Sequence, residues 1–158
     1  RDAPYFGGIT NRFNYKGIDV TVFFSYLFGN LVYNNDRTNV EDPSYFFDNM
    51  SRAVSREWRK PGDITDIPRA SQAMRRNTTR FLEDGSFIRL RNVQLGYNLP
   101  SKALKSIKLS SLRVFVMGEN LWTGFTFLGF DPELSSGVLT GAQYPALRTV
   151  TAGLTVGF

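Results

Sequence analysis

The side chains in this chain best suited to acid–base chemistry form one pair. Asp131 and Glu133 lie two residues apart in "GFDPE" (Gly129 to Glu133), and paired carboxylates are the arrangement that glycoside hydrolysis uses. Such a pair needs a fixed geometry around its substrate, which two loop residues do not guarantee, and Asp-Pro is also ordinary turn chemistry. We therefore interpret the motif as a turn, and we predict no catalytic residue.

Composition excludes most other catalytic chemistry. The 158 residues include no cysteine and no histidine, which excludes disulfides, cysteine nucleophiles, Cys/His zinc sites and histidine catalysis. The segment "GVLTGAQ" lacks the Lys-Ser/Thr ending of a phosphate-binding loop. The net charge is +5, but acids and bases are interspersed, without the basic stripe of a nucleic-acid-binding protein. We expect no enzyme, cofactor, metal or nucleic-acid partner.

Aromatic side chains are more informative, since they make up 15% of the residues. Five of them fall in segments that we expect to be loops: Trp58, Phe125, Phe127, Phe130 and Tyr144. Exposed aromatics can stack on sugar rings or contact a partner protein. Alternatively they pack the loops against each other, because long ordered loops need cores of their own. Internal packing is the favoured interpretation, and contact with a ligand or partner is the alternative.

Apolar side chains on every second residue predict five strands, at about residues 5–15, 18–33, 86–99, 111–122 and 147–158. The first two form a hairpin across Lys16-Gly17, because glycine adopts the positive φ of a tight turn at little cost. In the third strand, Arg89 and Arg91 share the parity of apolar residues. A β-bulge, or passage from a wet zone to an apolar one, would explain this.

Two long loops connect the strands, at about residues 34–85 and 123–146. In the first loop, "DPSYFFDNMSRAVSREW" predicts a helix. Asp42 can cap it, Pro43 suits its first position, and apolar residues recur at helical spacing. "RKPGDITDIPRA" then ends the helix. Loops of this length are uncommon in compact domains unless they carry function.

The connections alternate between short and long, which is typical of outer-membrane β-barrels with short periplasmic turns and long outer loops. The apolar parity would then face lipid, with aromatic residues at the interfaces. Soluble β-sandwiches show the same alternation, so periodicity alone leaves both architectures open. No run of about 18 apolar residues suggests a transmembrane helix.

Two features favour the membrane. The second strand carries Phe23 and Leu27 on its other face as well. The five predicted strands are also too few to close, and an open sheet cannot lie in hydrocarbon. We therefore expect a sector of a larger barrel. The chain begins at Arg1 without an initiator Met or a signal peptide, so we expect a processed protein or a piece of a longer one.

Charges within the strands test this expectation, because a charge facing lipid costs about 2–4 kcal/mol near the midplane. Arg113 and Glu119 oppose the apolar parity, so we predict that they face the barrel lumen. Arg89 and Arg91 stay undecided. The basic run "MRRNTTR" is interpreted as a solvated loop, with lipopolysaccharide phosphates as its alternative partner.

Five segments occur in an order that resembles a known family. They are "FGGITNRFNYKGIDVTVFFSYLFGNLVYN", "EWRKPGDITDIPRA", "FLEDGSFIRLRNVQLGYNLP", "LSSLRVFVMGENLWTGFTFLGFDPE" and "YPALRTVTAGLTVGF". Together they resemble the C-terminal end of the SusC/RagA-like TonB-dependent outer-membrane transporters of Bacteroidota, over nearly the whole chain.

The resemblance implies an all-β fold, an antiparallel transmembrane β-barrel sector in which residues 1–158 supply the last five strands of a 22-stranded barrel. It also implies a plug that precedes the barrel, a SusD-like lipoprotein lid, and TonB-driven import of glycans or peptides across the bacterial outer membrane. Phe158, with Val156 and Leu154, matches the terminal signature read by the barrel assembly machinery. The alternatives are a soluble β-rich glycan-binding module and, more weakly, a structural or adhesive surface protein.

Overall fold

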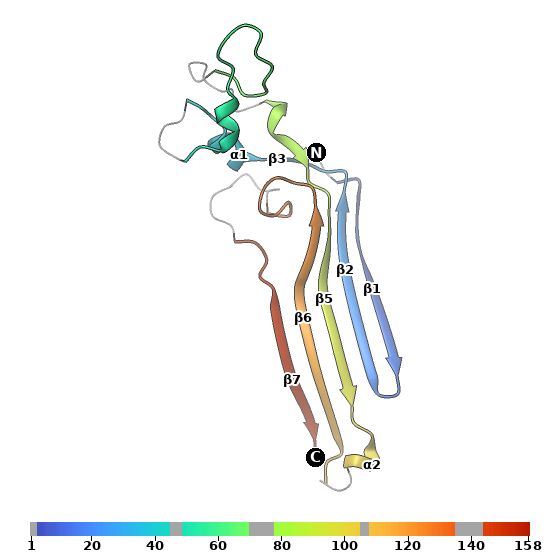
Figure 1. Ribbon diagram of the computed structural model, residues 1–158. Coiled ribbons are helices and arrows are strands. Elements are labelled where there is room, and N and C mark those ends of the chain that lie inside the picture. Colours follow the sequence, from blue (N-terminus) through green and yellow to red (C-terminus); the bar gives the residue numbers. More distant parts are fainter. Residues whose placement is uncertain (1–2, 45–48, 70–77, 105–107, 135–143) are drawn as a thin grey trace.

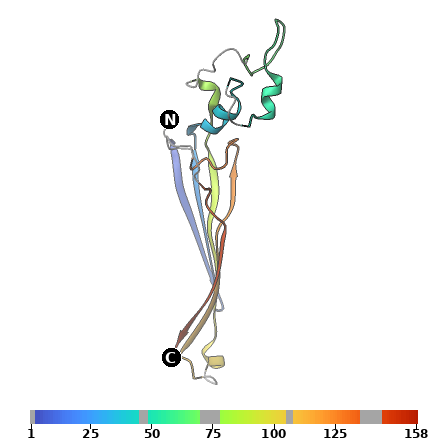
Figure 2. The ribbon, with the colours of Figure 1, turned by 90° about the vertical axis from the view of Figure 1, so that its left-hand side faces the viewer.

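The computed structural model describes residues 3–44, 49–69, 78–104, 108–134 and 144–158. Its main element is a five-stranded antiparallel sheet in the order β1-β2-β5-β6-β7 (Figure 1). The strands are β1 (Tyr5–Tyr15), β2 (Ile18–Phe28), β5 (Phe87–Asn98), β6 (Ser111–Phe125) and β7 (Thr149–Gly157). The strands twist along their length (Figure 2). This arrangement confirms the all-β, antiparallel prediction.

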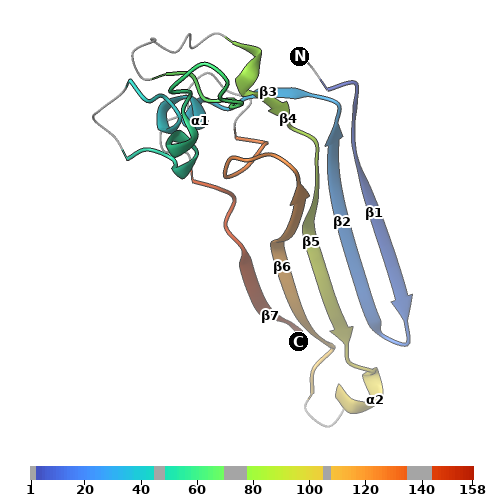
Figure 3. The ribbon, with the colours of Figure 1, turned by 45° about the horizontal axis from the view of Figure 1, so that its top comes forward.

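The smaller elements gather at the two ends of the sheet. A short sheet of β3 (Leu31–Tyr33) and β4 (Leu82–Asp84), the helix α1 (Asn35–Val40) and the 3-10 helices η1 (Arg52–Arg56) and η2 (Thr79–Phe81) lie at one end (Figure 3). We call this the loop end. The helix α2 (Ser101–Leu104) and the last residue lie at the opposite end. No helix among the described residues is long and apolar enough to cross a membrane.

Local chemistry explains where the elements differ from the predicted ones. The strand predicted over residues 18–33 is two strands, because Gly29 has a φ of 81° and turns the chain between β2 and β3. β6 continues to Phe125, three residues beyond its predicted end, and β7 begins at Thr149, two residues after its predicted start.

The helix predicted over residues 42–58 is wrong where the structure describes it. The Asp42 carboxylate accepts the N–H of Ser44 at 2.9 Å and closes a local turn instead of capping a helix. Of the later residues, only Arg52–Arg56 are helical, as η1, and residues 45–48 lie outside the described residues. The helix α1 begins earlier, because the Asn34 side chain accepts the N–H of Arg37 at 2.9 Å as its cap.

One face of the large sheet is apolar. Residues paired across neighbouring strands point to the same side, and the register therefore defines this apolar face. It includes Ile9, Phe13, Val20, Val22, Phe24, Leu90, Val93, Leu95, Val114, Val116, Val150, Ala152, Leu154 and Val156. No charged side chain occupies a paired position on it. The side chains of this face are half-buried or exposed in this chain, with Val150 71% and Leu154 67% exposed.

The opposite face is polar and carries the charges. Asp19, Arg89, Asn92, Gln94, Arg113, Glu119 and Thr151 belong to this polar face. The predicted irregularity in the third strand is a β-bulge, because the register shifts between Phe23 and Phe24 and leaves Arg91 as an extra residue. The bulge moves Arg89 from the apolar parity to the polar face, opposite Ser25 and Thr123.

Most of the buried hydrophobic residues lie at the loop end, while Phe87 begins β5 and Leu104 lies in α2 at the opposite end. Phe81 is 0% exposed and Ile67 1% exposed, and both belong to the loop elements. Val32 of β3 and Phe127, which follows β6, are also buried. The apolar face of the sheet is therefore left uncovered, and the loop end holds most of the interactions that fix side chains in place.

Candidate functional site at the loop end

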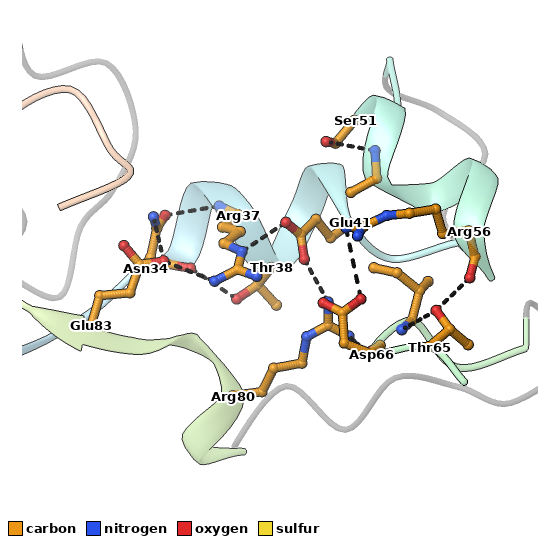
Figure 4. Close-up of polar contacts among 12 residues, drawn as sticks. Asn34, Arg37, Thr38, Glu41, Ser51, Arg56, Thr65, Asp66, Arg80 and Glu83 are labelled. Carbon is orange, nitrogen blue, oxygen red and sulfur yellow. Dashed lines mark hydrogen bonds and ion pairs between the residues drawn. The ribbon is translucent and has the colours of Figure 1, made fainter. Parts of the chain in front are cut away.

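The centre of the loop end is an aromatic ring between two guanidinium groups. The Arg37 and Arg80 guanidinium carbons lie 5.9 and 5.3 Å from the centroid of the Phe81 ring. Glu41 joins the two arginines, with 2.7 Å to the Arg37 Nε and 2.7 Å to the Arg80 Nη2 (Figure 4). The hydrogen bond to Glu41 raises the pKa of the Arg37 guanidinium, against the opposing effect of burial. Both cations are therefore fixed and neutralised.

Glu83 of β4 connects this cluster to the second long loop. Its Oε1 accepts hydrogen bonds from the Arg37 Nη1 at 3.0 Å and the Asn34 Nδ2 at 3.3 Å. Its Oε2 accepts the backbone N–H of Leu128 at 2.9 Å. One carboxylate thus joins residues that precede and follow β5 in the chain.

The two carboxylates of "GFDPE" are held by β5. The Arg89 Nη2 lies 2.7 and 2.6 Å from the two oxygens of Asp131, and the Arg89 Nη1 lies 3.0 Å from Glu133. Arg91 also pairs with Glu133 and donates from its Nε to Ser25 at 2.9 Å. We call Arg89, Arg91, Asp131 and Glu133 the clamp. Arg89 is 2% and Asp131 5% exposed, so Asp131 serves as a buried counter-ion of Arg89.

Phe130 lies where two pockets meet. The first pocket, of about 500 Å³, is lined by α1 residues together with Leu128, Gly129 and Phe130. The second pocket, of about 260 Å³, is lined by Arg89, Asn120, Thr123, Phe125, Phe130, Asp131, Pro145, Ala146 and Arg148. Phe130 is 80% exposed although the next residue, Asp131, is buried. The clamp thus holds the exposed Phe130 ring between the first and second pockets.

The five aromatic candidates from the sequence have different environments. Phe130 and Phe125 line the pockets, whereas Phe127 is 5% exposed and packs inside the loop end. Trp58 is half-buried, and its backbone N–H donates to the Ile67 carbonyl at 2.9 Å. Tyr144 is 86% exposed and lines neither pocket. The structure thus brings two of the five candidates together.

The remaining candidates lie along the sheet. Arg113 and Glu119 are half-buried on the polar face, and Arg113 forms an ion pair of 2.5 Å with Asp19 two strands away. Leu154, Val156 and Phe158 are 67%, 41% and 96% exposed. Among the described residues, no group of three acidic side chains is placed to hold a metal ion.

Sequence reasoning missed Arg37, Arg80 and Glu83, because nothing in their spacing shows that α1, η2 and β4 come together. It singled out Asp131 and Glu133 but not their partners. The sequence did contain one indication of these partners: Arg89 and Arg91 lie at positions whose alternation predicts the apolar face. A charge at such a position needs either a bulge that turns it away or a counter-ion.

Comparisons with known proteins agree with each other. TonB-dependent receptor P3 of Formosa agariphila is 32% identical over 162 residues, which cover 96% of this chain and 16% of the receptor. TonB-dependent receptor SusC of Bacteroides thetaiotaomicron is 26% identical, over 96% of this chain and 15% of SusC. The structure of the RagAB peptide importer in the 'open-open' state matches with a TM-score of 0.86 and 31% identity, over 99% of this chain and 17% of that chain. No family model matches the chain.

These matches confirm the resemblance seen in the sequence, and they identify the sheet as a fragment of a TonB-dependent β-barrel. The chain spans only 15–17% of the length of these relatives. Over nearly its whole length, this chain is similar to one part of the SusC/RagA-like TonB-dependent receptors.

Proposed function

We propose that this chain is the C-terminal barrel sector of an outer-membrane receptor that imports glycans or peptides. One observation carries the proposal. The sheet has one uncovered apolar face without paired charges, one polar face, and a packed loop cluster at a single end. A membrane-spanning wall has one apolar and one polar face, and outer-membrane barrels carry their long loops at one end.

The dimensions of the sheet support a membrane span. β1 has 11 residues with Tyr5 and Tyr15 at its ends, both 69% exposed. At about 3.3 Å per residue and a tilt of about 45°, it covers about 25 Å along the membrane normal, the height of the apolar band in outer-membrane barrels. The tyrosines then lie at the two interfaces, where their amphipathic rings are favoured.

In this proposal the polar face lines the lumen, where Arg113 and Glu119 contact the plug or the ligand. The loop end faces the outside, where the two pockets beside Phe130 meet the ligand or a SusD-like lipoprotein lid. Lipid surrounds the apolar face, and TonB acts through a part of the receptor that this chain does not contain. No residue described here is assigned covalent chemistry.

The experiment measures uptake by the whole receptor in its bacterial host. Cells receive labelled oligosaccharide and peptide mixtures, with and without a functional TonB, and carry either the unsubstituted receptor or the Phe130→Ala variant. We expect loss of TonB to abolish receptor-dependent uptake. We expect Phe130→Ala to lower uptake about 10-fold, as removal of a central aromatic contact does elsewhere, with an unchanged amount of receptor in the outer membrane.

Tyr144→Ala is the matched control, because Tyr144 is equally exposed but lines neither pocket. It should leave uptake unchanged. Receptor-dependent uptake that persists without TonB would refute import as the function. Equal losses in both variants would remove Phe130 from the ligand site.

A further inference from the structure

The second pocket carries an excess of positive charge. Within the clamp, the two arginines are matched by two carboxylates. Of these four residues, Arg89 and Asp131 line the second pocket, and Arg148 adds a second cation to its lining without a second acid. Arg148 is exposed and takes part in no ion pair or hydrogen bond among the residues that the structure describes. The nearest acid along β6 is Glu119, which is in register with Thr149. Glu119 forms no ion pair with Arg148.

The other lining groups favour an anion with a planar or apolar body. The Nε–H of the buried Arg89 has no acceptor among the described residues. Thr123 brings a hydroxyl group to the lining, and Asn120 donates to the Leu147 carbonyl at 3.2 Å, which ties the segment before Arg148 to β6. Phe125 and Phe130 supply aromatic walls. A guanidinium group binds a carboxylate through two parallel hydrogen bonds, because its planar fork of N–H donors matches the geometry of the two carboxylate oxygens.

We propose that the second pocket recognises a carboxylate group of the imported ligand, with Arg148 as the residue that provides the attraction. This inference rests on the proposed import function and narrows its substrate class to ligands that carry an acid. The carboxylate can belong to a peptide, as its C-terminus or an acidic side chain, or to a uronic acid in a glycan. Both sources present the same charged, planar group.

Binding to the purified whole receptor separates these sources. The probes are N-acetyl-trialanine and its C-terminal amide, and a trisaccharide of glucuronic acid and its neutral glucose counterpart. Isothermal titration calorimetry gives the affinity of each. We expect at least one acid to bind about 10-fold more tightly than its neutral counterpart, the gain of one charge-assisted contact. The pair that shows this preference identifies the source.

The variant Arg148→Gln should remove the preference, so that acid and neutral probes bind alike, and Arg148→Lys should retain part of it. Arg12→Gln is the matched control. Arg12 is also an exposed arginine, lies on the polar face, and has no ion pair with any residue that the structure describes. It lines neither pocket, and its loss changes the net charge equally. Its preference for the acid should match that of the unsubstituted receptor.

The inference is overturned by equal binding of acids and neutral probes to the unsubstituted receptor, by an acid preference that survives in Arg148→Gln, or by an equal loss of that preference in Arg12→Gln. The absence of measurable binding by both acids also overturns it. Each of these outcomes leaves import intact as long as TonB-dependent uptake persists, so the two proposals fail separately.

Discussion

Asp131 is the residue on which the position of Phe130 depends most directly. Both of its carboxylate oxygens contact Arg89, which is 2% exposed. Asp131→Asn removes the charge and leaves a buried guanidinium partly uncompensated, at a cost of about 3 kcal/mol. We expect amide hydrogen exchange in residues 126–134 to become on the order of 100-fold faster. Hydrogen exchange with mass spectrometry on the whole receptor measures this.

The control is the other ion pair of the polar face. Asp19 and Arg113 meet over Gly96, where a Cβ would lie 2.6 Å from each side chain, so only glycine leaves room for the pair. Asp19→Asn breaks a strand-to-strand contact with no loop attached. It should leave exchange in residues 126–134 unchanged. If Asp19→Asn accelerated that exchange equally, the clamp would not be a local support for the loop.

Residue-level contacts were only partly predictable from the sequence. The parity of Arg113 gives its face directly, because no bulge intervenes between it and its apolar neighbours in β6. For Arg89 the parity gives the wrong face, since one extra residue at the bulge reverses every side chain beyond it. The charge itself was the better guide, because a lone arginine is too costly on an apolar face.

At the scale of elements, Glu83 joins the two long loops. Its carboxylate contacts Asn34 and Arg37 on one side and the Leu128 N–H on the other. Glu83→Ala should let the segment around Leu128 move independently of α1. We expect the distance distribution between spin labels at positions 64 and 128 to broaden in pulsed electron spin resonance. Both side chains are exposed, at 103% and 73%, and this sector has no cysteine of its own.

Asp84→Ala is the matched control on the same strand. In the part of the chain that the structure describes, the Asp84 carboxylate accepts hydrogen bonds only from the hydroxyl and N–H of Ser86, and these bonds lower its pKa. Among the described residues, it therefore makes no hydrogen bond to α1 or to Leu128. The label distribution should keep its width in this variant. A broadening in Asp84→Ala as large as in Glu83→Ala would mean that β4 as a whole, and not the Glu83 carboxylate, couples the loops.

Elements with strict alternation were predictable, whereas those of the loop end were not. The pairs of β1 with β2 follow from two alternating segments and one Lys-Gly turn. The apolar spacing after Asp42 predicts a helix, yet the hydrogen bond that the Ser44 N–H donates to the Asp42 carboxylate favours a turn. Asn34 caps a different helix, α1, which has no apolar periodicity in the sequence. In the loops, local side-chain hydrogen bonds compete successfully with helical spacing.

The molecule as a whole consists of a wall without its own core and a loop cluster with one. A soluble module of this size would bury the apolar face against other parts of the same chain. Here Phe13, Val150 and Leu154 are 62–71% exposed, so that face has to be covered by something else. The proposed occupant is lipid, and a single charge placed on either side of one strand distinguishes lipid from water.

Val150 and Thr151 are neighbours in β7 on opposite faces, near the middle of the wall, in register with Gly118 and Met117 of β6. Val150→Lys places a charge in hydrocarbon, at a cost of about 2–4 kcal/mol near the midplane. Thr151→Lys places the same charge on the polar face, where its cost is close to zero. We expect Val150→Lys to lower the fraction of folded receptor, seen as the heat-modifiable band in gel electrophoresis of outer membranes, while Thr151→Lys leaves it unchanged. Equal folding of the two variants would mean that lipid does not cover the apolar face, and greater damage from Thr151→Lys would mean that the two faces are assigned the wrong way round.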